Sequence, residues 1–330
     1  MAKSDGDAPD RDGQPAVLRV YRGGRARGSR RQPASPEEVA RRLSALERRV
    51  ERALGSGAGD DAPDLLGRLA DQTLSVFASA RRFDVGQDVG AALVDALYRF
   101  WWRVDAAGLE RVPATGAVIL VTNRGGALLP YEALMLQVAL AARRGRGALF
   151  VVDDWLGRLP LLGSALARLG GVRGTPGQLR RLLAEGEAVI VAPEVGQPKR
   201  FSQRYRVASF GRGGFARLAI ETGAAVVPVA VIGAEEVHPL LARVDLPGRL
   251  LGLPTLPITP TFPWLGLAGL VPLPTKWLLL AGEPIDVAGR HPAADAADVA
   301  TVGRLRDQAR ERLQALVLEG LRRRRSLFLG

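Results

Sequence analysis

Four short segments at junctions between predicted elements hold the residues of this chain that could do chemistry. They span residues 122–132, 170–174, 193–206 and 210–215. Arginine side chains and free backbone N–H groups in glycine-rich turns suit a phosphate, and a positioned carboxylate can accept a proton from a reacting hydroxyl. The candidate residues are Asn123, Arg124 and Glu132 in the first segment, Arg173 in the second, Pro193, Glu194 and Lys199 in the third, and Arg212 in the fourth.

The elements that must position these segments are short strands alternating with helices. Apolar, β-rich runs lie at 117–122, 148–152, 188–192 and 225–232, and a further run follows Trp277. Helical patterns separate them, at 131–144, 161–169, 177–185 and 213–222. Strands buried on both faces and alternating with helices predict an α/β domain with a mostly parallel central sheet flanked by helices. In such sheets functional residues gather where strands end, which is where the four segments lie.

The chain divides into four predicted regions. Residues 1–34 are polar and rich in glycine and arginine, which predicts a disordered basic tail without a signal peptide. Residues 35–100 form a helical N-terminal region, 101–290 the α/β domain, and 291–330 a C-terminal amphipathic helix. The uncharged stretch at 250–275 contains six prolines, so it cannot cross a bilayer as one helix. The aromatic and arginine cluster at 98–103 suits a bilayer interface and a hydrophobic core about equally.

Composition narrows the class of partner. The chain carries a net charge of +12, which favours an anionic partner: nucleic acid, an anionic bilayer or a phosphorylated substrate. Few aromatic residues lie among the arginines and no nucleic-acid-binding motif appears, so we expect membrane and phosphate and no nucleic acid. The chain has no cysteine and only two histidines, His238 and His291, so no metal site and no cofactor is expected.

In this order and spacing the four segments resemble the glycerolipid acyltransferase family that includes bacterial 1-acylglycerol-3-phosphate acyltransferase. The likeness runs from about Trp101 to Ile285, and it is complete in Phe-Gly-Arg-Gly-Gly-Phe at 210–215 and in Gly-Ala-Glu-Glu-Val-His-Pro at 233–239. It implies the glycerol-3-phosphate acyltransferase-like fold. It also implies transfer of an acyl chain from acyl-CoA or acyl carrier protein to lysophosphatidate or a similar glycerolipid. The basic tail, the 98–103 cluster, the proline-broken stretch and the four arginines at 322–325 predict a cytoplasmic protein held peripherally on the anionic inner face of the cell membrane.

The residues depart from the family pattern at informative positions. Arg124 stands where the family has its histidine general base, and an arginine stays protonated in proteins. Glu132 replaces the aspartate that orients the histidine, and Val195 replaces the glycine of Pro-Glu-Gly. The resemblance associates Arg173 and the Pro193-Glu194 pair with the phosphate of the acceptor. Arg124 itself either pairs with Glu132 or binds a phosphate or an oxyanion.

Two hypotheses therefore compete. In the first, the chain is an acyltransferase with Glu132 as the candidate base, Arg173 and Arg212 on phosphate, and Glu194 organising the acceptor pocket. In the second, it is a catalytically silent relative that binds lipid or acyl thioester, or regulates a partner. A basic nucleic-acid-binding protein would rest on charge alone and leave the ordered segments unexplained. The oligomeric state stays open.

Overall fold

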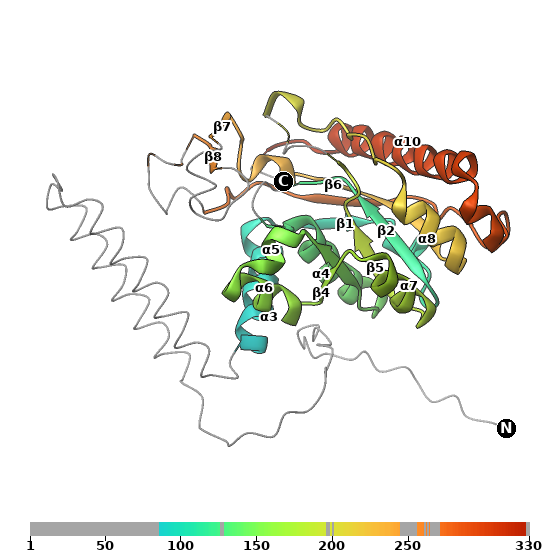
Figure 1. Ribbon diagram of the computed structural model, residues 1–330. Helices are drawn as coiled ribbons and strands as arrows, with labels where there is room; N and C mark the ends of the chain where they lie inside the picture. The colour runs from blue at the N-terminus through green and yellow to red at the C-terminus, as the bar shows by residue number, and fades with distance from the viewer. Residues whose placement is uncertain are drawn as a thin grey trace, which may run out of the picture.

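A seven-stranded sheet forms the centre of the domain in the computed structural model. Figure 1 shows this sheet with helices packed around it. Each pair of neighbours is parallel except β6 and β9, so the predicted mostly parallel α/β fold is confirmed. The structure describes residues 86–125, 129–195, 199, 201–244, 256–260, 262, 264 and 271–327. In sheet order the strands are β1 (Asp105–Ala107), β9 (Leu278–Ala281), β6 (Ala225–Ile232), β2 (Val118–Thr122), β5 (Ala188–Val191), β3 (Leu149–Val152) and β4 (Gly171–Arg173).

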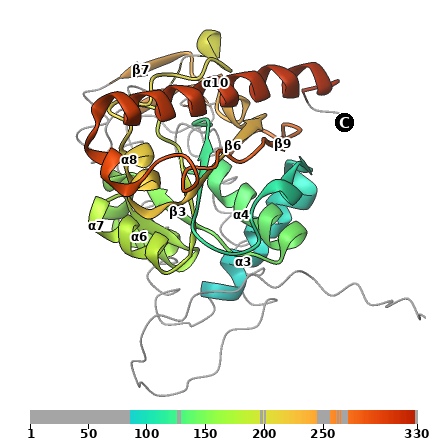
Figure 2. The ribbon, with the colours of Figure 1, turned by 90° about the vertical axis from the view of Figure 1, so that its right-hand side faces the viewer.

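Helices cover both faces of the sheet because its central strands are apolar on both sides. Along β2, Val118 and Leu120 belong to one buried cluster, and Ile119 and Val121 belong to the other. This alternation follows from the two-residue period of a strand. The first cluster packs under α3 (Gly86–Ala96), α4 (Tyr131–Arg144), α5 (Asp154–Arg158) and α6 (Pro160–Arg168). The second cluster packs under α7 (Pro176–Ala184), α8 (Gly214–Thr222) and α10 (Val299–Arg323). Figure 2 shows α10 on one side of β6 and α4 on the other.

Short helical turns and one hairpin complete the described chain. They are η1 (Leu97–Trp101), η2 (Leu109–Arg111), η3 (Phe201–Gln203), η4 (Ala234–Glu236) and η6 (Ala293–Ala297), with β7 (Ala242–Val244) antiparallel to β8 (Leu256–Ile258). The tail predicted for 1–34 lies outside the described residues, as do most of the helical region predicted for 35–100 and much of the proline-rich stretch. The boundaries of those regions stay predictions.

The long helix α10 lies across β6 and β9 and closes one face of the domain (Figure 1). Asp298 caps its N-terminus, accepting hydrogen bonds from the backbone N–H groups of Ala300 at 3.0 Å and Thr301 at 3.1 Å. Its buried stripe follows the helical period. The stripe consists of Val302, Leu305, Ala309, Leu313 and Val317.

The aromatic cluster at 98–103 divides between the core and the surface. Trp102 is fully buried and stacks on Trp277 with ring centroids 4.6 Å apart. Phe100 is 76% exposed, whereas Trp101 is 38% exposed and donates its indole N–H to the Pro272 carbonyl at 2.9 Å. Trp102 therefore belongs to the hydrophobic core, and a role of the exposed aromatic residues at a bilayer interface stays a prediction. Among the described residues, no helix has both the length and the apolar character that a bilayer span requires.

Candidate active site

The candidate site lies at the carboxyl ends of four neighbouring parallel strands. In sheet order these are β6, β2, β5 and β3. The residues that follow them come together at one edge, as expected for parallel strands. Arg124 lies just beyond β2, Glu194 beyond β5, Asp153 beyond β3 and Glu235 beyond β6.

Glu194 holds three parts of the chain together. Its Oε1 accepts the backbone N–H of Arg124 at 2.8 Å, and its Oε2 accepts that of Ala208 at 2.8 Å. The Nζ of Lys199 lies 2.8 Å from the same Oε2. The Glu194 side chain is only 2% exposed, so these donors compensate the cost of burying its charge. Glu194 therefore fixes the loops after β2 and β5 relative to the 201–208 segment.

Lys199 joins Glu194 to a second buried carboxylate. Its Nζ lies 3.1 Å from Oε1 of Glu235, whose side chain is 3% exposed. Oε2 of Glu235 accepts the backbone N–H of Tyr205 at 2.6 Å. Burial raises the pKa of Glu235, and the positive charge of Lys199 opposes that rise. We refer to Glu194, Lys199 and Glu235 as the buried charge cluster.

Asn123 has a fully buried side chain that pairs with the neighbouring strand. Its Oδ1 accepts the backbone N–H of Val231 at 2.8 Å, and its Nδ2 donates to the Val231 carbonyl at 2.9 Å. The side-chain amide thus continues the ladder between β2 and β6 past the end of β2. This contact sets the direction in which the chain leaves the strand, and a contact with substrate stays a prediction.

Arg124 forms an ion pair with Asp153, a residue that sequence reasoning missed. A guanidinium nitrogen lies 3.0 Å from Oδ1 of Asp153, and the two side chains are 32% and 41% exposed. The sequence offers Glu132 as one partner of Arg124, and that pairing stays a prediction beside the observed ion pair with Asp153. The signal that could have found it is the strand-end rule, because Asp153 directly follows the apolar run 148–152. The pair leaves both charged groups accessible to a ligand.

Glu132 lies behind the loop that carries Arg124. It is 4% exposed and sits in the first turn of α4. Gly125 passes so close that a Cβ at this position would stand 3.3 Å from Oε2 of Glu132 and 2.3 Å from the Cβ of Ala234. Only glycine therefore fits here, which explains part of the Gly-Gly pair in the first segment.

The predicted phosphate ligands Arg173 and Arg212 are both exposed. Arg173 ends β4, the edge strand, and Arg212 lies between Gly211 and Gly213, which have positive φ angles of 57° and 72°. Within the described residues the structure shows no contact that joins either arginine to the buried charge cluster. Pro193 is partly buried beside Glu194. Contacts of these residues with phosphate stay predictions.

His238 is buried beside the aromatic ring of Tyr131. It is 5% exposed, and its ring lies 5.9 Å from that of Tyr131. Burial lowers its pKa to about 4, so the imidazole is neutral at physiological pH. Its Nε2 has no hydrogen-bond partner among the described residues.

Comparisons with known proteins agree with this geometry. The model of the family described as Acyltransferase matches residues 103–232, which include the ends of β2, β3, β5 and β6. The chain is 40% identical over 267 residues to an uncharacterized protein of Mycobacterium tuberculosis, covering 78% of this chain and 74% of the relative. It is 26% identical over 194 residues to the Gallus gallus protein named DGAT1/2-independent enzyme synthesizing storage lipids, covering 58% of this chain and 55% of that one.

A solved structure gives a further comparison. The 1-acyl-sn-glycerophosphate (LPA) acyltransferase PlsC of Thermotoga maritima is 20% identical, with a TM-score of 0.48, over 73% of this chain and 81% of that chain. The family resemblance found in the four segments is confirmed by the family match. Residues 103–232 form an acyltransferase domain, and the chain belongs to the acyltransferase family.

Proposed function

We propose that this protein transfers an acyl chain from an acyl-CoA or acyl carrier protein thioester to the free hydroxyl of lysophosphatidate or a similar glycerolipid. The observation that carries the proposal is the pair of hydrogen bonds that the buried Glu194 accepts from the backbone of Arg124 and Ala208. These bonds hold the loops after β2 and β5 together at the strand ends of an acyltransferase domain. The Gallus gallus relative is named for the synthesis of storage lipids, which supports lipid as the substrate class.

The proton acceptor in this reaction is a carboxylate, because Arg124 cannot take a proton. The acceptor hydroxyl oxygen attacks the thioester carbonyl carbon, the carbon–sulfur bond breaks, and the hydroxyl proton passes by way of the base to the departing thiolate. Glu132 is the base that the first segment supplies. Asp153 is the second candidate, since it is 41% exposed and is held beside the Arg124 guanidinium. The same guanidinium is suited to stabilise the oxyanion that forms during attack.

We further propose peripheral contact with the anionic face of the cytoplasmic membrane. Large apolar side chains are exposed near the N-terminal end of the described chain and in the 264–271 region. They are Leu93 at 60%, Phe100 at 76%, Trp264 at 76% and Val271 at 53%. Exposed aromatic side chains together with arginines suit the headgroup region of a bilayer, and each basic residue near an anionic surface contributes about 1 kcal/mol.

The Arg124–Asp153 ion pair also favours a second function. A strand-end arginine that is already paired can recognise a phosphate without any proton transfer. In that case the chain is the silent relative: it binds lysophosphatidate or acyl thioester and turns neither over.

An acylation assay separates the two functions. Purified full-length protein is incubated with labelled oleoyl-CoA and lysophosphatidate, and phosphatidate is measured for wild type, Glu132→Gln and Asp153→Asn. We expect product from wild type and a loss of about 10²–10⁴-fold in whichever variant lacks the base. Arg168→Ala, on the exposed end of α6, is the matched control and should keep the wild-type rate. Binding of lysophosphatidate without product in wild type would establish the silent function instead.

A further inference from the structure

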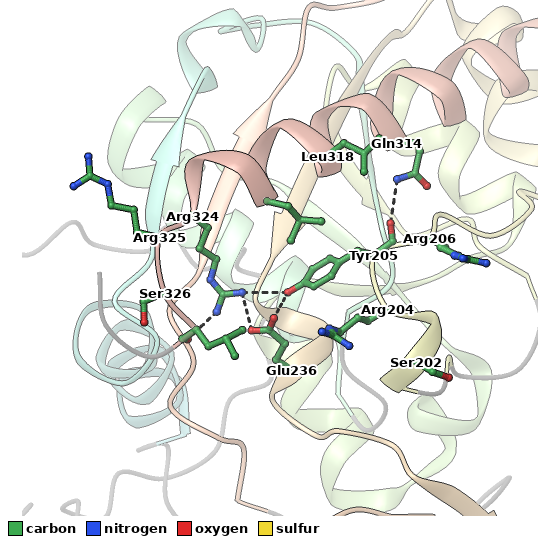
Figure 3. Close-up of a pocket in the computed structure, with 12 residues that line it drawn as sticks. Ser202, Arg204, Tyr205, Arg206, Glu236, Gln314, Leu318, Arg324, Arg325 and Ser326 are labelled. Atoms are coloured by element: carbon green, nitrogen blue, oxygen red, sulfur yellow. Dashed lines mark hydrogen bonds and ion pairs between the residues drawn. The ribbon is translucent and has the colours of Figure 1, made fainter.

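A hollow lies between the 201–206 loop, η4 and the C-terminal end of α10 (Figure 3). Its volume is about 670 Å³. We name it the C-terminal groove. None of the residues assigned to acyl transfer lines it. Tyr205 and Glu236 line its wall together with four arginines, Arg204, Arg206, Arg324 and Arg325.

The charge of the groove selects an anion. Glu236 is the carboxylate of the lining, and its Oε2 lies 2.7 Å from a guanidinium nitrogen of Arg324. Its other oxygen accepts the hydroxyl of Tyr205 at 2.6 Å. Both side chains of the ion pair are 5% exposed. Because Arg324 compensates the single carboxylate, the positive charges of Arg204, Arg206 and Arg325 remain to attract a ligand.

Arg324 is held firmly by its neighbours. Its terminal nitrogens donate to the Tyr205 hydroxyl at 3.2 Å and to the Leu327 carbonyl at 2.7 Å. Its Nε is buried without a hydrogen-bond partner among the described residues. The ion pair with Glu236 and these two hydrogen bonds fix the Arg324 side chain in the wall of the groove. Arg204, exposed on the loop, is held over the Phe201 ring with its guanidinium carbon 4.2 Å from the ring centroid.

Apolar side chains lie beside these arginines. Leu318 on α10 and Leu327 beyond it are 49% and 47% exposed, and Leu321 also lines the groove. In Figure 3, Leu318 reaches the groove from α10, while Ser202 and Arg204 lie across it on the η3 side. A free phosphate would leave the leucines in water, whereas a lipid would cover them with its chain.

We propose that the C-terminal groove binds one molecule of a phosphate-bearing lipid, with its phosphate on the side of Arg204 and Arg206 and its acyl chain on the leucines. This site is separate from the acyl-acceptor site and does not depend on the proposed reaction. Tyr205 connects the two regions, since its hydroxyl contacts Glu236 and its backbone N–H donates to Glu235 of the buried charge cluster. Its φ angle of 66° is unusual for a residue with a side chain, so this conformation needs support from its surroundings.

The test uses dihexanoyl phosphatidate, which is water-soluble and has no free glycerol hydroxyl to acylate. Its affinity for the full-length protein is measured by calorimetry, and hydrogen exchange with mass spectrometry locates the contact. We expect protection in peptides covering 201–207 and 314–327. Arg204→Ala combined with Arg206→Ala should weaken binding about tenfold or more. The matched control, Arg168→Ala with Arg217→Ala, removes two exposed arginines outside the groove and should leave affinity unchanged.

Two further ligands separate the sources of the phosphate and the role of charge. Inorganic phosphate should bind more weakly than dihexanoyl phosphatidate, and Leu318→Ser should weaken the lipid but not the inorganic ion. Dihexanoyl phosphatidylcholine, whose headgroup is neutral overall, should bind more weakly as well. The proposal is overturned if inorganic phosphate binds as tightly as the lipid. It is also overturned if protection is confined to the strand ends at 122–125 and 192–195, or if the paired groove variant binds like its control.

Discussion

Replacement of Lys199 by methionine tests the buried charge cluster most sharply. The ammonium group lies 2.8 Å from Glu194 and 3.1 Å from Glu235, and the two carboxylates are 2% and 3% exposed. Methionine keeps much of the volume but leaves both carboxylates without their cation. Removing one partner of a buried ion pair costs about 3–5 kcal/mol, and we expect Lys199→Met to lower the free energy of unfolding by an amount in this range.

The assay is urea unfolding followed by fluorescence, for wild type, Lys199→Met, Glu235→Gln and the double variant. Glu235→Gln should restore part of the stability that Lys199→Met loses, because it removes one of the two uncompensated charges. The difference between Lys199→Met and wild type should also narrow as the pH falls and Glu235, whose pKa burial raises, takes up a proton. A loss below about 1 kcal/mol, the usual value of an exposed pair, together with no rescue by Glu235→Gln, would refute the reasoning.

Three further predictions follow from other parts of the site. Arg124→His restores an imidazole at the position of the family histidine. We expect it to raise lysophosphatidate acylation within the 10²–10⁴-fold span of a general base, measured as initial rate, and a slower variant would show that the arginine itself contributes to catalysis. His238, whose pKa burial lowers to about 4 from an ordinary value of 6.5, stabilises the fold fully above pH 6.5. As the pH falls from 6.5 to 4, protonation of the unfolded state should lower the free energy of unfolding by about 3 kcal/mol. His238→Gln should lack this part of the pH dependence in urea unfolding. The same pH dependence in the variant and in wild type would contradict the prediction. Gly125→Ala places a Cβ 2.3 Å from that of Ala234, so it should cost about 1–3 kcal/mol of stability and depress acylation, and a variant matching wild type in both assays would contradict the close approach.

The central strands could be predicted from sequence because a strand that is buried on both faces consists of consecutive apolar residues. The runs at 117–122, 148–152, 188–192 and 225–232 coincide with β2, β3, β5 and β6. The antiparallel pairing of β9 with β6 could not be predicted in the same way. Its partner strand lies more than forty residues earlier in the chain, and periodicity carries no information about such a distant pairing.

The candidate site was predictable in its location and less so in its contacts. The strand-end rule predicts Glu194 and Lys199 as site residues, whereas their partner Glu235 stands out in the sequence only as part of the motif at 233–239. Long-range pairing of charges depends on how the loops fold back, and a residue type alone does not state its partner. Asp153 was missed for a related reason, because a single acidic residue at the start of a helix is ordinarily explained by the helix dipole.

The central claim is acyl transfer to a lipid hydroxyl. The molar ratio of its two products, free CoA and phosphatidate, tests this claim most directly. Full-length protein is mixed with oleoyl-CoA and lysophosphatidate, and free CoA thiol and phosphatidate are quantified in the same samples. The account predicts that thiol release requires lysophosphatidate and equals phosphatidate formed, mole for mole. Thiol release that is the same without lysophosphatidate would indicate thioester hydrolysis, and no release above the enzyme-free rate would indicate a silent protein. Either result would contradict acyl transfer by this chain.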